Sequence, residues 1–200
     1  MHKETESNLE EEQEKKSGRD AYEWVQALVC SVLVVLTIFT FGIRLIGVDG
    51  HSMLQTLQHG DRLLILNSLW DNDYEYGDIV VLRKESFSND PIVKRVIATE
   101  GQTVDIDFNN GVVYVDGEAL EEDYINEPTY IAEGTELPLT LGEGELFVMG
   151  DNRNHSGDSR NNLLGAVDSR YVIGKAIILA FPGPDVTTEK RDFSRIGWIG

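Results

Sequence analysis

Cysteine is almost absent from this chain, since Cys30 is the only one among 200 residues. A single thiol cannot close an intramolecular disulfide, so the fold has no disulfide framework even if it faces an oxidising space. Stability must therefore come from packing, and a chain of this length with 41% hydrophobic residues can bury a core of its own. We expect one domain of ordinary size with appendages.

Basic residues are also scarce. The chain has 17 Lys and Arg against 35 Asp and Glu, a net charge of -18. Such a surface repels phosphate backbones and does not favour anionic lipid, so we expect no nucleic acid among the partners. Internal repeats and a second linker are lacking as well, which favours a single compact unit after the N-terminal segments.

Two appendages are predicted at the N-terminus. Residues 1–24 are rich in Glu and Lys with little apolar content, which predicts a disordered tail to which we assign no function. Residues 25–44 contain an uncharged run of 19 residues, Val25–Ile43, before Arg44. As a helix this run is about 28 Å long, against roughly 30 Å of hydrocarbon in a bilayer. We therefore predict one transmembrane helix over residues 25–44.

Two alternatives to an anchor are less favoured. A cleavable signal peptide would have a basic beginning and small residues before the cut, whereas the segment before this run is acidic and no such site follows it. A buried helix of a soluble protein would show a polar face, which this run lacks. Lys15, Lys16 and Arg19 before the run, against Arg44 alone just after it, predict a cytoplasmic N-terminus and an extracellular domain over residues 45–200 in a single-pass protein of the cell membrane.

The remainder has the pattern of a mainly β protein built from antiparallel sheets. Short β-branched or aromatic runs are separated by turn residues, and Asn110–Gly111 between two alternating runs is a strong hairpin signal. The predicted strands are Arg62–Leu66, Asp78–Arg83, Ile92–Ala98, Thr103–Phe108, Val112–Val115, Glu145–Met149 and Tyr171–Phe181.

A serine lies just beyond the predicted membrane span, in the segment Gly50–His51–Ser52–Met53. Taken alone it is weak evidence, because most serines in turns are caps or surface hydroxyls. The lysine in Pro91–Ala98 is more informative. Strand alternation places Lys94 on one face with Ile92, Val96 and Ala98.

A lysine on an apolar face has two interpretations. It can extend to water from an edge strand, or its burial can lower its pKa far enough to make it a neutral base near pH 7. A neutral lysine beside a serine forms a Ser-Lys dyad, a known substitute for the Ser-His-Asp arrangement. None of His51, His59 and His155 has a spacing that favours the histidine triad.

The segment Met149–Arg160 is dense in carboxylates, guanidinium groups and hydroxyls. We predict two ion pairs, Asp151 with Arg153 and Asp158 with Arg160, that form a rigid polar scaffold. A calcium loop is rejected, because Arg153 and His155 occupy positions that need oxygen ligands. We expect no metal and no cofactor.

In this order, the three segments resemble those of bacterial type I signal peptidase, the membrane-anchored Ser-Lys protease that removes signal peptides from exported preproteins. The resemblance extends over nearly all of the chain from residue 45 and includes Gly77–Val81, Val93–Ile97 and the specific motif Gly150–Arg160. The length and single span resemble the short Gram-positive form, whose small insertion would fall within about 100–145.

The resemblance implies a role for each matching residue. Ser52 would be the nucleophile, Lys94 the general base, and Ser156 the hydroxyl that orients the lysine. Structural support would come from Arg95, Asp151, Arg153, Asp158 and Arg160, and the substrate pocket from Val48, Met53, Leu57, Ile92 and Val93. The expected partners are signal peptides of secreted preproteins and the lipid bilayer.

The chain departs from the family pattern at Gln55, where the family usually has Pro, so the turn after the serine is less constrained. We expect slower or altered activity, not its loss. Gly50 replaces a Ser that lines the oxyanion hole in some members, so oxyanion stabilisation would rest mainly on backbone N–H groups. Two other functions stay open: a non-catalytic signal-peptidase-like chaperone in pilus assembly, and a self-cleaving SOS-repressor-type protease, whose soluble, DNA-binding form does not fit residues 1–44.

Overall fold

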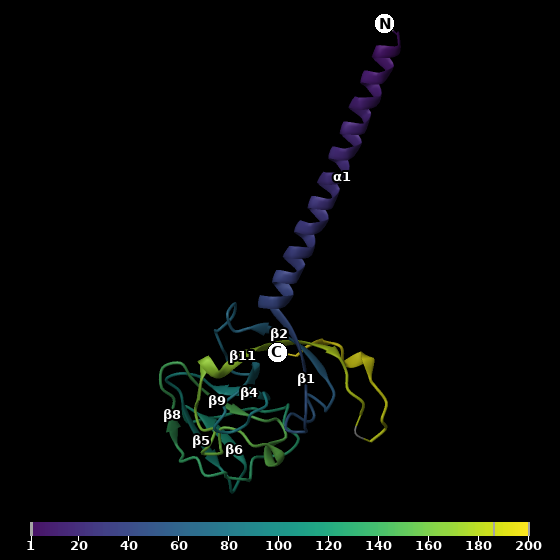
Figure 1. Ribbon diagram of the computed structural model, residues 1–200. Helices are drawn as coiled ribbons and strands as arrows, with labels where there is room; N and C mark the ends of the chain where they lie inside the picture. Colours follow the sequence, from purple (N-terminus) through teal and green to yellow (C-terminus); the bar gives the residue numbers. More distant parts are fainter. Residues whose placement is uncertain (1, 186, 200) are drawn as a thin grey trace. The chain divides into compact units, whose positions relative to one another are not determined.

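The computed structural model describes residues 2–185 and 187–199 (Figure 1). The chain divides into two compact units, one up to Gly42 and one from Ile43 onward, and each is described by itself. The first unit is a single helix, α1 (His2–Phe41). The regular structure of the second unit is mainly two sheets of antiparallel strands, which confirms the predicted fold class.

Helix α1 contains one stretch, Tyr22–Thr40, that is long and apolar enough to cross a membrane, and none of it is buried within the protein. The helix begins at His2, which differs from the disordered tail expected over residues 1–24. Glu, Lys and Gln are good helix formers, so a segment too polar to form a core can still continue a helix. The helix ends before Ile43 and Arg44, which belong to the first strand instead of the anchor.

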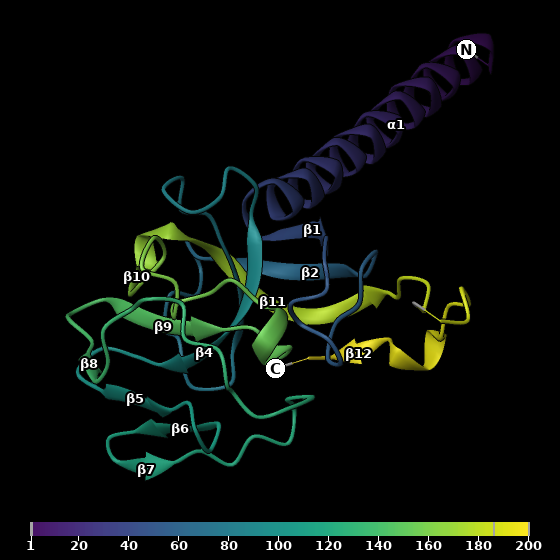
Figure 2. The ribbon, with the colours of Figure 1, turned by 90° about the horizontal axis from the view of Figure 1, so that it is seen from below.

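The larger sheet has the order β1-β2-β11-β3-β4-β9-β10, with β12 also pairing with β11 (Figure 2). Its neighbouring strands are antiparallel, and β4 pairs with β3 on one side and β9 on the other. The strands are β1 (Ile43–Gly47), β2 (Arg62–Asn67), β3 (Ile79–Leu82), β4 (Ile92–Ala98), β9 (Glu145–Met149), β10 (Val167–Asp168), β11 (Val172–Phe181) and β12 (Gly197–Trp198).

A smaller sheet of order β7-β6-β5-β8 lies within the segment 100–145. The hairpin predicted at Asn110–Gly111 is confirmed: β5 and β6 pair from Asp107 opposite Val112, and Gly111 has a φ of +73°, which favours glycine. The strands of this sheet are β5 (Thr103–Asp107), β6 (Val112–Val115), β7 (Glu118–Ala119) and β8 (Leu139–Thr140). Among the described residues there are also three short 3₁₀ helices: η1 (Arg153–His155), η2 (Ser169–Tyr171) and η3 (Phe193–Arg195).

Strand β4 contributes to all three hydrophobic clusters of the core. Val93 packs in the first, Val96 in the second and Ile97 in the third. The pairing of β4 with β9 is irregular between Val96 and Ala98, and Ala98 packs with Ile97 in the third cluster. The prediction that Ala98 shares the face of Lys94 and Val96 is therefore wrong, because a β-bulge interrupts strict alternation.

Candidate active site

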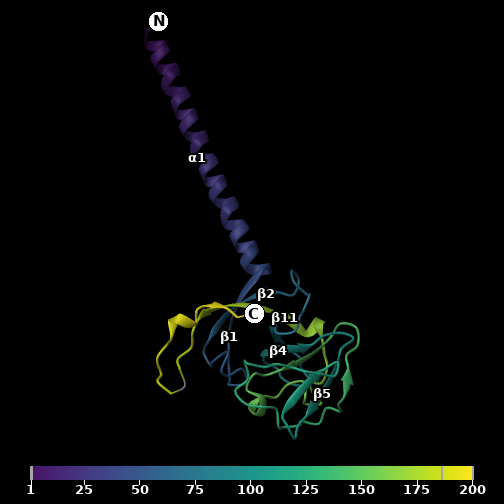
Figure 3. The same ribbon diagram turned by 180° about the vertical axis from the view of Figure 1, so that it is seen from behind.

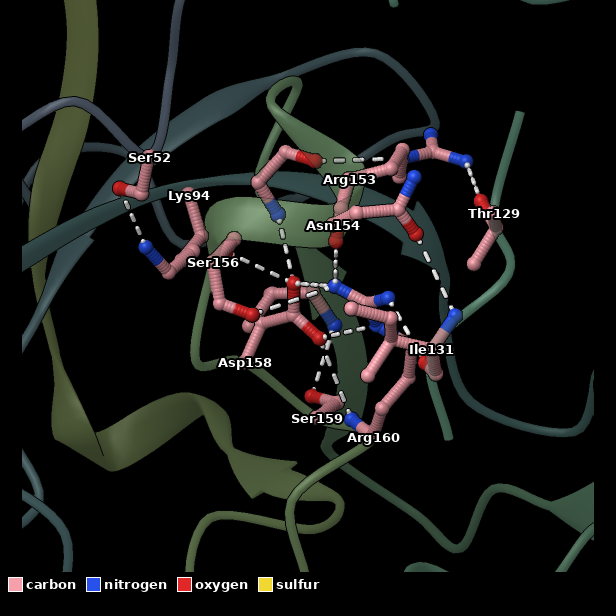
Figure 4. A network of polar contacts seen from close by, with 12 residues as sticks. Ser52, Lys94, Thr129, Ile131, Arg153, Asn154, Ser156, Asp158, Ser159 and Arg160 are labelled. Carbon is pink, nitrogen blue, oxygen red and sulfur yellow. Dashed lines mark hydrogen bonds and ion pairs between the residues drawn. The ribbon is translucent and has the colours of Figure 1, made fainter. Parts of the chain in front are cut away.

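The side chains of Ser52 and Lys94 are in contact, although the two residues are 42 positions apart in the sequence. Ser52 lies in the turn between β1 and β2, and Lys94 lies in the middle of β4. The Lys94 amine donates a hydrogen bond of 2.7 Å to Ser52 Oγ (Figure 4). Lys94 is only 3% exposed, whereas Ser52 is half-buried. A buried amine thus contacts a hydroxyl that keeps some access to solvent.

Burial lowers the pKa of Lys94 from 10.5 to about 8, because an ammonium loses its hydration there. The nearby guanidinium of Arg160 lowers this pKa further. The carboxylates of Asp158, Asp151 and Glu133 act in the opposite direction and raise it. At weakly alkaline pH a large fraction of Lys94 is therefore neutral and able to accept a proton.

The segment after β9 holds the backbone of the serine turn. The Asn152 amide donates to the Ser52 carbonyl at 3.0 Å, and the Asn152 side chain donates to the His51 carbonyl at 2.9 Å. A Cβ on Gly150 would lie 2.4 Å from the Ser52 carbonyl oxygen and 2.2 Å from Ser156 Oγ, so only glycine fits. Sequence reasoning placed Gly150 and Asn152 in the motif but did not assign them these contacts.

Ser156 is buried beside this turn, and its hydroxyl donates to Asp158 Oδ2 at 2.8 Å. Within the described part of the chain, no hydrogen bond joins Ser156 to Lys94, so the orienting role of this hydroxyl stays a prediction. The same Asp158 oxygen accepts from the Gly150 amide at 3.0 Å. Asp158 thereby connects Ser156 to the residue that faces the Ser52 carbonyl.

One of the two predicted ion pairs is confirmed. Arg160 donates from Nε and Nη2 to the two oxygens of Asp158, each at 2.8 Å, and both side chains are fully buried. Such a two-pronged pair fixes both planar groups relative to each other.

The other predicted pair, Asp151 with Arg153, is wrong. Asp151 accepts from Arg95 Nε and Nη2 at 2.9 and 2.8 Å, because Arg95 is opposite Met149 in the sheet and Asp151 follows two residues later. Arg153 begins η1 and binds Glu122 at 2.8 and 2.5 Å.

Sequence reasoning missed the contribution of the segment between β7 and β8. Glu122 pairs with Arg153, and the Tyr124 ring lies 4.1 Å from the Arg95 guanidinium carbon. Thr129 accepts from Arg153 at 3.0 Å, and the Ile131 carbonyl accepts from Arg160 at 3.0 Å (Figure 4). Arg153 and Arg160 therefore find some of their hydrogen-bond acceptors in this segment, and no local sequence pattern indicated that it lies beside the motif.

Four of the five predicted pocket residues pack together. Val48, Met53, Leu57 and Val93 are buried in the first hydrophobic cluster, whereas Ile92 packs against the second, because successive strand residues face opposite sides. Gln55 is exposed on the serine turn and follows a cis peptide bond. Gly50 has a φ of +101°, which explains a glycine at that position.

Comparison with known proteins identifies the family. Residues 21–181 match the model of signal peptidase, peptidase S26. The signal peptidase I of Bacillus licheniformis is 34% identical over 182 residues, which are 87% of this chain and 96% of that protein. The probable signal peptidase I-1 of Synechocystis is 40% identical over 68% of this chain and 69% of that protein. A solved signal peptidase I from Enterococcus faecalis is 30% identical, over 52% of this chain and 96% of that one, with a TM-score of 0.43.

The family match includes the serine turn, strand β4 and the whole motif from Gly150 to Arg160. It also includes the apolar part of α1, which is compatible with a membrane anchor. The relative from Bacillus licheniformis matches over nearly its full length. The chain therefore belongs to the signal peptidase family, peptidase S26, and is a serine peptidase that cleaves signal peptides.

Proposed function

We propose that this peptidase acts through a Ser52–Lys94 dyad and an acyl-enzyme. The observation that carries the proposal is the 2.7 Å contact between Ser52 Oγ and the Lys94 amine, which is buried and has a lowered pKa. Neutral Lys94 takes the proton of Ser52 as Oγ attacks the scissile carbonyl. Lys94 then gives this proton to the leaving amine, and water hydrolyses the remaining ester with Lys94 again as the base.

The substrate is the signal peptide of an exported preprotein. Anchoring by α1, with its N-terminus in the cytoplasm, would place the catalytic unit outside. Ser52 is 11 positions after Phe41, where α1 ends, so the chain between them spans at most about 40 Å, which limits the distance of the serine from the bilayer. The cluster of Val48, Met53, Leu57 and Val93 would form shallow subsites that admit small side chains such as Ala, since little space remains beside buried residues.

The pH dependence of kcat/KM tests the proposed base. We expect the rate of preprotein cleavage to rise with pH and level off above an inflection near 8, since only neutral Lys94 can accept the serine proton. The measurement is cleavage by the purified full-length chain in detergent, at fixed ionic strength. An inflection near the ordinary lysine value of 10.5 would contradict the role assigned to Lys94.

Glu133 offers a second test of the same titration. Its negative charge raises the pKa of Lys94, so Glu133→Gln should lower that pKa and move the inflection of kcat/KM to lower pH. Glu136→Gln is the matched control, because it removes an exposed carboxylate from the same segment. Equal profiles for Glu133→Gln and the control would contradict the effect assigned to the Glu133 carboxylate.

A further inference from the structure

The C-terminal segment, residues 187–199, lies outside the part of the chain that matches the family. It nevertheless returns to the larger sheet, as the yellow end of the ribbon shows in Figure 3. There β12 pairs with β11 through Ile178 opposite Trp198 and Leu179 opposite Gly197. Ile199 packs against the first hydrophobic cluster, which also contains Met53 and Leu57 of the serine turn. The segment is therefore part of the structure around Ser52.

Arg195 of this segment binds the serine turn directly. Its Nη2 donates to the Thr56 carbonyl at 3.2 Å and to Asp61 Oδ2 at 2.7 Å, and its Nη1 donates to Asp61 Oδ1 at 3.1 Å. Asp61 is fully buried and ends the turn, where its carbonyl accepts from the Val48 amide at 2.8 Å. A single guanidinium thus holds the middle and the end of the loop that contains Ser52.

Thr56 connects this contact to the polar network beside Lys94. Its hydroxyl donates to Asp151 Oδ2 at 2.5 Å, and Asp151 is the ion-pair partner of Arg95, the neighbour of Lys94 on β4. The turn is therefore fixed at the Thr56 carbonyl by Arg195 and at the Thr56 hydroxyl by Asp151. Without Arg195, the turn would keep its contacts with Asp151 and Asn152 but would lose the one at the Thr56 carbonyl.

We propose that Arg195 is a positioning residue, which keeps Ser52 Oγ within hydrogen-bond distance of the Lys94 amine. The inference rests on the proposed dyad, and it makes the C-terminal segment a functional part of the peptidase. Misplacement of a reacting group by about 1 Å can lower a rate about 100-fold. A planar guanidinium can bind one carboxylate with two N–H groups and also reach a carbonyl, whereas an ammonium is a point charge.

The test compares kcat and KM for preprotein cleavage by full-length variants in detergent. We expect Arg195→Gln to lower kcat about 10- to 100-fold with little change in KM, and Arg195→Lys to give an intermediate value. Arg191→Gln is the matched control: Arg191 is an exposed arginine of the same segment that binds the Pro182 carbonyl. Its kcat should equal that of the wild type.

Thermal unfolding of the same variants separates positioning from simple loss of stability. Arg195→Gln leaves the Asp61 carboxylate buried without its ion-pair partner, so its melting temperature should fall. We expect its kcat to stay low at temperatures well below that transition, where the variant is folded. A kcat for folded Arg195→Gln within twofold of that of Arg191→Gln would overturn the proposal.

Two other outcomes can be distinguished from a failure of the positioning role: misfolding of Arg195→Gln, and failure of the proposed dyad. If Arg195→Gln does not fold, Arg195→Lys decides, since it keeps a positive charge beside Asp61: unchanged kcat in that folded variant overturns the positioning role, and a reduced kcat supports it. Full cleavage by Ser52→Ala would instead disprove the proposed dyad, whatever Arg195 does.

Discussion

Replacement of Ser52 or Lys94 by alanine is expected to lower kcat for preprotein cleavage by about 10⁴-fold or more. Ser52→Ala removes Oγ, the atom that forms the acyl-enzyme. Lys94→Ala removes the only amine within hydrogen-bond distance of Ser52 Oγ among the described residues. Because the two side chains act as a unit, the double variant should be no slower than the slower single variant. Cleavage can be followed by mass spectrometry of the mature product.

Two variants control for the chemistry of the residues replaced. Lys175 is a partly buried lysine on β11 that pairs with Asp71 and Asp78, and Ser88 is a serine of the loop before β4. Lys175→Ala and Ser88→Ala should keep kcat close to the wild-type value. Cleavage by Ser52→Ala at an unchanged rate would contradict the proposed nucleophile, and additive losses in the double variant would contradict a shared proton.

The strands that form the site could be predicted from the sequence because they are long enough to show a pattern. The predicted bounds of Ile92–Ala98 and Glu145–Met149 agree with β4 and β9. The strands that were missed give weak signals: β7, β8, β10 and β12 have two residues each, and β1 begins inside what reads as the continuing apolar run. The sequence does not mark the end of the apolar helix, because the strand that follows it is also apolar.

Only part of the site could be predicted, because many of its contacts join residues that are far apart in the sequence. Alternation indicated that Lys94 is buried, and the motif suggested Asp158 with Arg160, which are two residues apart. The partners of Asp151 and Arg153 come from β4 and from the segment after β7, so local spacing suggested the wrong pair. Arg195 is 134 residues from Asp61, and neither residue belongs to a motif that would indicate the contact.

The motif from Gly150 to Arg160 is a buried polar core that holds the serine turn. Buried charges are tolerated when they are paired and hydrogen-bonded. Arg153 and Arg160 of the motif, and Arg95 beside it, each bind a carboxylate and at least one backbone carbonyl. The cost of removing one member is consequently large, because its partner stays buried without compensation.

The tripeptide Asp-Ser-Arg occurs twice, as Asp158–Arg160 in the motif and as Asp168–Arg170 after β10. In both copies the arginine binds the aspartate through two nitrogens, but the first pair is fully buried, whereas the second is solvent-accessible, with the Arg170 side chain 88% exposed. Asp158→Asn should lower the free energy of unfolding by about 3–5 kcal/mol, since Arg160 keeps a buried charge without its partner.

Asp168→Asn is the matched control, and it should change stability much less, because water replaces the lost partner of an exposed arginine. Unfolding of the full-length chain by urea in detergent, followed through tryptophan fluorescence and near-ultraviolet circular dichroism, measures both. Asp158→Asn should also lower the pKa of Lys94, whose ammonium this carboxylate favours, in the fraction that stays folded. Equal losses of stability in the two variants would contradict the argument that burial, and not the tripeptide itself, determines how much each ion pair contributes.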